Sequence, residues 1–175
     1  VPRDSARVVA KLESANPTGS MKDRMARAIV ERAAATGRLP PGGTVVEYTA
    51  GTTGISLALV CSALGFQSHF VFSDAFSEEK RYTMRAYGAE IKDVPSDRGQ
   101  ITGQLITTMI ATAGEISRRP GHWWADQLSN PDGETGYQAL GEELWTQTGG
   151  RVNAFVQAVS TAHSIHGTAR ALRRH

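Results

Sequence analysis

Apolar and polar positions follow two different periods along this chain, and the two patterns alternate. Short runs rich in β-branched and aromatic residues predict strands. These runs cover residues 7–12, 44–48, 69–72, 89–94, 123–125 and 154–159. Between them, apolar residues recur at the spacing of a helix face. The predicted helices cover residues 21–36, 55–64, 78–87, 101–116, 136–148 and 165–172.

Strands that alternate with helices predict an α/β fold, in which helices flank wound parallel sheets. Ligands of such folds bind at the carboxyl ends of the strands. The sequence has no internal repeat and no low-complexity linker. The loops near residues 37–43 and 129–151 are where we expect the chain to cross between two subdomains.

Composition and charge narrow the range of partners. The 175 residues carry a net charge of +2, which favours neither a nucleic acid nor an anionic membrane. No stretch approaches about 18 consecutive apolar residues, and residues 1–4 lack the apolar core of a signal peptide.

Cys61 is the only cysteine, so we expect a buried, unpaired thiol and a cytoplasmic setting. His163 and His166 have helical spacing but no third ligand, so no metal site is expected.

The most informative single residue is Lys22, at the start of the first predicted helix. Pro17 and Gly19 form a turn before it, and Ser20 is a suitable N-cap. The positive end of a helix dipole disfavours an ammonium group, so we expect a lowered pKa for this lysine. A partly neutral amine can attack a carbonyl and form a Schiff base. Taken alone, however, Lys22 could equally be a solvated lysine on a helix's first turn.

Three predicted loops consist of glycine and small hydroxylic residues, and each one ends at a helix start. They are residues 16–22, 49–54 and 160–164. Helix N-termini bind anions through free N–H groups, and small side chains let a phosphate or carboxylate approach the backbone. Three such loops beside a lysine suit a phosphorylated aldehyde, and pyridoxal phosphate is the obvious candidate.

Four segments carry a resemblance to a known family. Residues 11–24 (KLESANPTGSMKDR) closely resemble the cofactor-lysine motif of the cysteine synthase family. Residues 47–54 (EYTAGTTG) resemble that family's substrate-binding loop, and residues 127–131 (QLSNP) and 147–156 (QTGGRVNAFV) match further segments in the same order. These are pyridoxal-phosphate enzymes with the fold of the tryptophan synthase β-subunit, fold type II.

The resemblance implies a role for each matching residue. Lys22 would bind the cofactor covalently and act as general base at the substrate's Cα. The substrate carboxylate would be bound by Thr49, Ala50, Gly51, Thr53 and Gln127. The cofactor would be held by Lys22, Thr52, Ser160, Thr161, Ala162, His163 and Ser164. Residues 1–40 and 150–175 would belong to a larger cofactor-lysine subdomain, and residues 41–149 to a smaller substrate-loop subdomain.

Two site positions depart from the family pattern. Thr52 stands where the family has an asparagine that binds the cofactor's ring hydroxyl. Ala162 and His163 stand where it has glycines of the phosphate loop, and a side chain there is strained if the backbone needs a positive φ. His163 could in turn supply positive charge to the phosphate.

Length is the third departure, because family members continue well past residue 175. We therefore expect the second subdomain to be truncated, with sheet edges and apolar helix faces left uncovered.

The resemblance implies β-elimination from an O-activated serine followed by β-replacement with a sulfur nucleophile, acting on a small amino-acid substrate in a homodimer. A serine or threonine ammonia-lyase is the nearest alternative. The second alternative is a truncated, degenerate homologue without catalysis.

Overall fold

A computed structural model of the chain describes residues 5–175. Its centre is a four-stranded sheet with the order β3-β2-β1-β4, in which all neighbouring strands are parallel. The strands are β1 (Thr44–Tyr48), β2 (Gln67–Ser73), β3 (Glu90–Val94) and β4 (His122–Trp124). Parallel neighbours require a crossover between them, and helices supply it here. The predicted α/β fold with a parallel sheet is confirmed.

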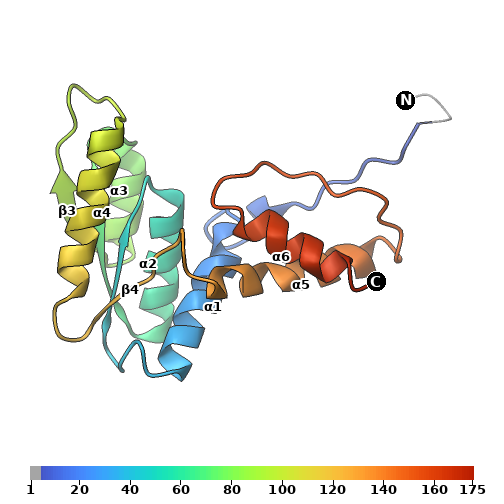
Figure 1. Cartoon of the computed structure of the whole chain (residues 1–175), viewed down its shortest axis with the longest axis horizontal. Helices are drawn as coiled ribbons and strands as arrows, with labels where there is room; N and C mark the ends of the chain where they lie inside the picture. Colours follow the sequence, from blue (N-terminus) through green and yellow to red (C-terminus); the bar gives the residue numbers. More distant parts are fainter. Residues whose placement is uncertain (1–4) are drawn as a thin grey trace.

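The helices are α1 (Lys22–Ala35), α2 (Thr52–Leu64), α3 (Glu78–Ala86), α4 (Gly103–Ser117), α5 (Asp132–Gln147) and α6 (His163–Leu172), with a 3₁₀ turn η1 (Glu13–Ala15) before them. The first four cover the two faces of the sheet (Figure 1). Val46 and Val71 pack with Met109 of α4 on one face of the sheet. Phe70 and Phe72 belong to the other core, together with residues of α1 and α2 such as Met25 and Leu57. The central strands β1 and β2 are therefore buried on both faces, whereas the edge strand β3 keeps Glu90, Lys92 and Asp93 exposed.

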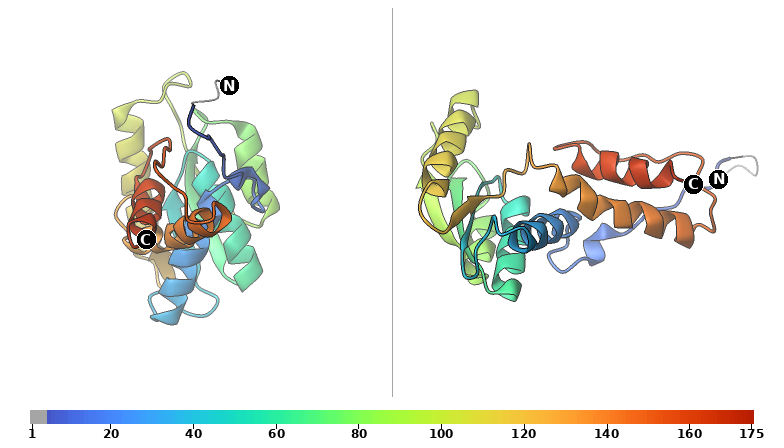
Figure 2. Two further views of the ribbon diagram at one scale, coloured as in Figure 1. Left: turned by 90° about the vertical axis from the view of Figure 1, so that its right-hand side faces the viewer. Right: turned by 60° about the horizontal axis from the view of Figure 1, so that its bottom comes forward.

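The last two helices lie beside α1 rather than on the sheet. Figure 2 shows α5 and α6 side by side, extending away from the sheet toward both chain ends. Glycines allow these helices to approach closely. A Cβ on Gly136 of α5 would lie 2.4 Å from the carbonyl oxygen of Arg24, and one on Gly141 would lie 2.5 Å from the Cβ of Ala171. The sheet body is therefore joined to the α5–α6 pair through α1.

Most predicted elements agree with the structure, with shifted ends. Helix α2 begins at Thr52, ahead of the expected Ile55, and α5 begins at Asp132, ahead of the expected Gly136. Gly65 ends α2 in the left-handed conformation (φ +76°), as its position predicts. Cys61 is buried, and burial raises the pKa of its thiol to about 12, so the expected inert thiol is confirmed.

Two predicted strands are wrong. Residues 7–12 and 154–159 form no strand, and they leave Val8 90% and Val156 89% exposed. A strand is stabilised by hydrogen bonds to a neighbour, and within residues 5–175 no strand lies beside either segment. Apolar alternation alone therefore did not decide these two elements. The sequence prediction that concerns residues 1–4 lies outside the described residues.

Candidate active site

The loop of residues 49–54 follows β1 at its carboxyl end and leads directly into α2. Thr49 is buried, and its hydroxyl accepts hydrogen bonds from the N–H groups of Gly51 (3.0 Å) and Gly54 (3.1 Å). Gly51 has φ +131°, and a Cβ there would lie 2.1 Å from Cδ of Lys80. The loop is thus held by its own first side chain and requires glycine at its centre.

Lys22 is the first residue of α1, and its amine points across to the loop that precedes α6. Lys22 Nζ donates a hydrogen bond to Thr161 Oγ1 at 3.1 Å. Burial lowers the pKa of the Lys22 amine, and the charge of Glu47 opposes that shift. The expected direction is confirmed, but its main cause is desolvation rather than the helix dipole assumed from the sequence.

Ser20 is not the N-cap of α1, contrary to the sequence prediction. The helix begins one residue later than expected, with Met21 at the cap position. The Ser20 hydroxyl instead accepts a hydrogen bond from the Lys22 N–H at 3.1 Å. The serine therefore satisfies a free amide of the first turn, as a cap does, from one position farther out.

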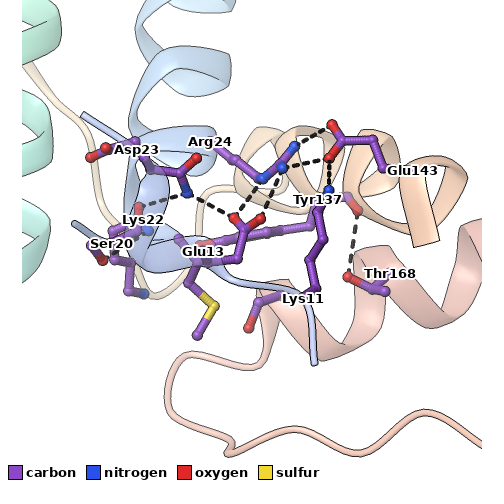
Figure 3. A network of polar contacts seen from close by, with 12 residues as sticks. Lys11, Glu13, Ser20, Lys22, Asp23, Arg24, Tyr137, Glu143 and Thr168 are labelled. Carbon is purple, nitrogen blue, oxygen red and sulfur yellow. Dashed lines mark hydrogen bonds and ion pairs between the residues drawn. The ribbon is translucent and has the colours of Figure 1, made fainter. Parts of the chain in front are cut away.

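A network of charged residues fixes the turn before Lys22 (Figure 3). Arg24 of α1 pairs with Glu13 of η1 (Nε to Oε2, 2.6 Å) and with Glu143 of α5 (Nη2 to Oε2, 2.8 Å). Asn16 donates a hydrogen bond to Glu13 Oε2 at 2.8 Å and one to the Ser20 carbonyl at 3.1 Å. The turn that presents Lys22 is therefore tied to two other elements by charge-assisted hydrogen bonds.

Gln127 follows β4 and lies beside the loop of residues 49–54. Its side-chain oxygen accepts a hydrogen bond from the Thr53 hydroxyl at 2.7 Å, and its Nε2 donates one to the Tyr48 carbonyl at 3.0 Å. The fold therefore brings Gln127 to the loop, and binding of the substrate carboxylate by Gln127 stays a prediction.

The third small-residue loop ends at the N-terminus of α6. Ala162 has φ +66°, whereas His163 is the first residue of the helix, so the strain expected at these two positions falls on the alanine. His163 Nδ1 and Gln157 Oε1 are buried and have no hydrogen-bond partner among the described residues. Burial, and after it the charge of Lys22, lowers the pKa of His163, which disfavours the cationic ring.

These loops meet around a cavity of about 410 Å³ at the carboxyl end of β1. Its lining includes most of the site residues that the sequence predicts, namely Lys22, Thr49, Ala50, Gly51, Thr52, Thr53, Gln127, Ser160 and Thr161. Ala162, His163 and Ser164 do not line it. Lys80 of α3 does, and this second lysine was not predicted. No cluster of metal-binding side chains is found in residues 5–175.

Sequence reasoning also missed Glu47, which is fully buried in β1. Burial raises the pKa of Glu47 to about 8, although hydrogen bonds from Gln127, Trp124 and Tyr48 act in the opposite direction. The available signal was a carboxylate inside the β-forming run of residues 44–48, where an acidic residue is unfavourable unless it has partners.

Comparison with known proteins identifies the family. A family model described as pyridoxal-phosphate dependent enzyme matches residues 2–175. The chain belongs to this family. The resemblance to its fold type II cysteine synthase group is confirmed by relatives and structures alike.

Cysteine synthase B of Escherichia coli (strain K12) is 36% identical over 173 residues, which are 98% of this chain and 55% of that protein. Cysteine synthase of Staphylococcus aureus (strain N315) is 36% identical over 98% of this chain and 54% of its own length. The chain thus spans about half the length of the curated relatives it matches.

Solved structures of the same group superpose on this fold. A cysteine synthase from Entamoeba histolytica aligns with a TM-score of 0.86 and 31% identity, covering 94% of this chain and 47% of that one. An O-ureido-L-serine synthase aligns with a TM-score of 0.84 and 35% identity, covering 94% and 51% of the two chains.

The residues around the cavity fit the cofactor that the family name implies. A half-buried amine with a lowered pKa lines the cavity, as Schiff-base formation requires. Ser160 and Thr161 offer hydroxyl groups just before the free N–H groups of α6, and Thr52 stands at the start of α2. The donor set therefore suits an aldehyde that carries an anionic group.

Proposed function

We propose that this chain carries the cofactor lysine and the substrate loop of a cysteine synthase-like enzyme, which performs β-elimination and β-replacement on an O-activated serine. The observation that carries the proposal is the position of Lys22. Its amine is half-buried, bonded to Thr161, and lies in a cavity lined by two loops of small residues that end at helix N-termini.

Lys22 is proposed as the catalytic residue. Its role is to bind the cofactor covalently, to remove a proton from the substrate's Cα and to return it. A base must be neutral before it can accept a proton, so burial of the amine serves this role. Pyridoxal phosphate, when bound, supplies the electron sink for the carbanion formed at Cα.

The remaining site residues are proposed as binding groups. The substrate carboxylate is proposed to bind at the start of α2, to Ala50, Gly51 and Thr53. The Gly51 N–H and the Thr53 hydroxyl donate to Thr49 and Gln127 in this fold, so they would exchange these bonds for bonds to the carboxylate. Thr49 and Gln127 are also proposed to bind the substrate carboxylate. Both side chains are bonded to the loop itself, so they would keep the N–H donors of the loop in place. The cofactor is proposed to contact Thr52 and the 160–164 loop, that is Ser160, Thr161, Ala162, His163 and Ser164.

The degenerate homologue is kept as a second candidate on one observation. Ala162 occupies a left-handed backbone position that favours glycine, inside the proposed phosphate loop. A chain that cannot bind the cofactor would support this alternative. The ammonia-lyase alternative would show instead as release of ammonia from serine without incorporation of sulfide.

The test compares the two lysines that line the cavity. The chain is incubated with pyridoxal phosphate, reduced with borohydride, and digested for peptide mass spectrometry. We expect the label on Lys22. Before reduction, a visible absorbance band should appear in the wild-type chain, persist in Lys80→Ala and be absent in Lys22→Ala. Label on Lys80, or no label at all, would overturn the assignment. If label is found on Lys22, addition of O-acetylserine and sulfide tests cysteine formation.

The wider properties of the whole protein are proposals as well. A small amino-acid substrate, a homodimer and a cytoplasmic location follow from the family. The division into residues 1–40 with 150–175 and residues 41–149 is proposed on the same basis. None of the helices within residues 5–175 has the length and apolar composition needed to cross a bilayer.

A further inference from the structure

Glu47 is a buried acid that the proposed reaction does not use. It lies on β1 two residues before the substrate loop, and its side chain has no exposed surface. Three donors point at its carboxyl group: the Gln127 N–H (2.8 Å), the Tyr48 N–H (3.0 Å) and, more weakly, the Trp124 indole N–H (3.4 Å). These three contacts fix the orientation of the buried carboxyl group.

The contact with Gln127 joins Glu47 to the substrate loop. The Gln127 N–H is bonded to Glu47, and the Gln127 side chain bridges the Tyr48 carbonyl and the Thr53 hydroxyl. The preceding residue, Asp126, has φ +47°, a strained conformation for a residue other than glycine. The bond from the Gln127 N–H to Glu47 therefore stabilises this turn. The turn supports the substrate loop, through the contact of Gln127 with Thr53.

We propose that Glu47 is a positioning residue, which fixes the Gln127 turn against the substrate loop. The inference stands on the contacts of Glu47 and Gln127, and only its catalytic meaning rests on the proposed function.

The test is amide hydrogen exchange by NMR in the 175-residue chain without added cofactor. Glu47→Gln replaces one acceptor oxygen with an NH₂ group. Because Tyr48 and Trp124 donate to the same oxygen of Glu47, the remaining oxygen serves them best and the NH₂ group faces the Gln127 N–H. We therefore expect the exchange rate of the Gln127 amide to rise by about tenfold, while amides at the far end of β1 keep their rates.

Two further variants serve as controls. Glu31→Gln, the same substitution at an exposed pair with Arg27, should leave the Gln127 exchange rate unchanged. Glu47→Asp keeps both carboxyl oxygens on a shorter side chain, and should restore the protection of the Gln127 amide in part.

A folded Glu47→Gln chain with unchanged Gln127 exchange would overturn the inference. A uniform rise in exchange over the whole sheet would also overturn it, because Glu47 would then be a general stability residue. Neither result depends on cofactor binding. Failure of this inference is therefore distinguishable from failure of the proposed function, which is read from labelling of Lys22 by pyridoxal phosphate.

Discussion

At the scale of single residues, burial rather than residue type determines the chemistry of this site. Lys22 and Glu47 are ordinary ionisable residues whose pKa values move toward neutrality, because water is excluded from both. Burial also raises the pKa of the Cys61 thiol, to about 12. Of these three groups, Lys22 lines the cavity, and the catalytic proposal rests on it.

Glu47 predicts how stability depends on pH. Its pKa of about 8 in the fold lies above the ordinary value of 4.5, so the folded chain retains a proton that the unfolded chain releases. The resulting stabilisation is complete below pH 4.5 and is lost as pH rises to about 8, by at most about 4 kcal/mol. Urea unfolding from pH 5 to 8.5 should show wild-type stability falling relative to Glu47→Gln. If the free energies of unfolding of the two chains changed equally with pH, the prediction would be contradicted.

Ala162 predicts a stabilising substitution. Its left-handed backbone (φ +66°) costs an alanine about 1 kcal/mol that glycine does not incur. Part of that gain is offset by the greater freedom of glycine in the unfolded chain. We expect Ala162→Gly to raise the free energy of unfolding by about 0.5 kcal/mol. Ala169→Gly, inside α6, should lower it by about 1 kcal/mol, and equal losses in both variants would refute the assignment of strain.

At the scale of elements, the position of the Lys22 turn depends on helices that are distant in sequence. Arg24 joins η1, α1 and α5, and Lys11 adds a further ion pair to Glu143 at 2.6 Å. The pairing lowers the pKa of Glu143 to about 2. This stabilisation is present above the ordinary value of 4.5 and is lost as pH falls through about 2.

Removal of the arginine tests this connection. Arg24→Met keeps most of the aliphatic stem but removes the guanidinium from two partly buried carboxylates, so we expect a loss of about 2 kcal/mol. Glu143 would keep its pair with Lys11, and Glu13 its bond to Asn16. The matched variant Arg27→Met breaks an exposed pair with Glu31 and should cost less than about 0.5 kcal/mol. Chemical denaturation compares the two, and similar costs would show that the network does not contribute to folding.

The contact between α5 and α6 depends on glycine. A methyl group on Gly141 would lie 2.5 Å from Ala171 Cβ and 2.7 Å from the Thr168 carbonyl, so one helix must move. We expect Gly141→Ala to cost about 2 kcal/mol. Gly114→Ala on α4 meets only Trp124 at 3.6 Å and should stabilise by up to about 1 kcal/mol through helix propensity. Thermal unfolding measures both, and a neutral Gly141→Ala would mean that the helices pack less closely.

At the scale of the whole molecule, the described residues form a four-stranded sheet but leave two apolar segments without a neighbouring strand. Val8, Val9 and Leu12 are exposed in the first segment, and Val156 and Val159 in the second. Figure 1 shows both segments on the side of the molecule away from the sheet. Exposed apolar side chains on irregular backbone favour association with other chains.

We therefore expect the 175-residue chain to self-associate as its concentration rises. The double variant Val8→Lys with Val156→Lys should reduce this association severalfold, because the added charges oppose burial of both segments. Tyr82→Lys places the same charge at an exposed position on α3 and should have little effect. Sedimentation velocity measures the change. Equal association in all three chains would exclude these segments as the contact surface.

The sequence by itself determined those features that depend on neighbours along the chain. Periodicity identified the helices and the four paired strands, and the small-residue loops with a lysine identified most of the residues that line the cavity. Local rules failed at residues 7–12 and 154–159, because a strand exists only where another segment offers backbone hydrogen bonds. They also missed Glu47 and the cause of the Lys22 shift. Both depend on burial, and only the tertiary structure decides which side chains lose contact with water.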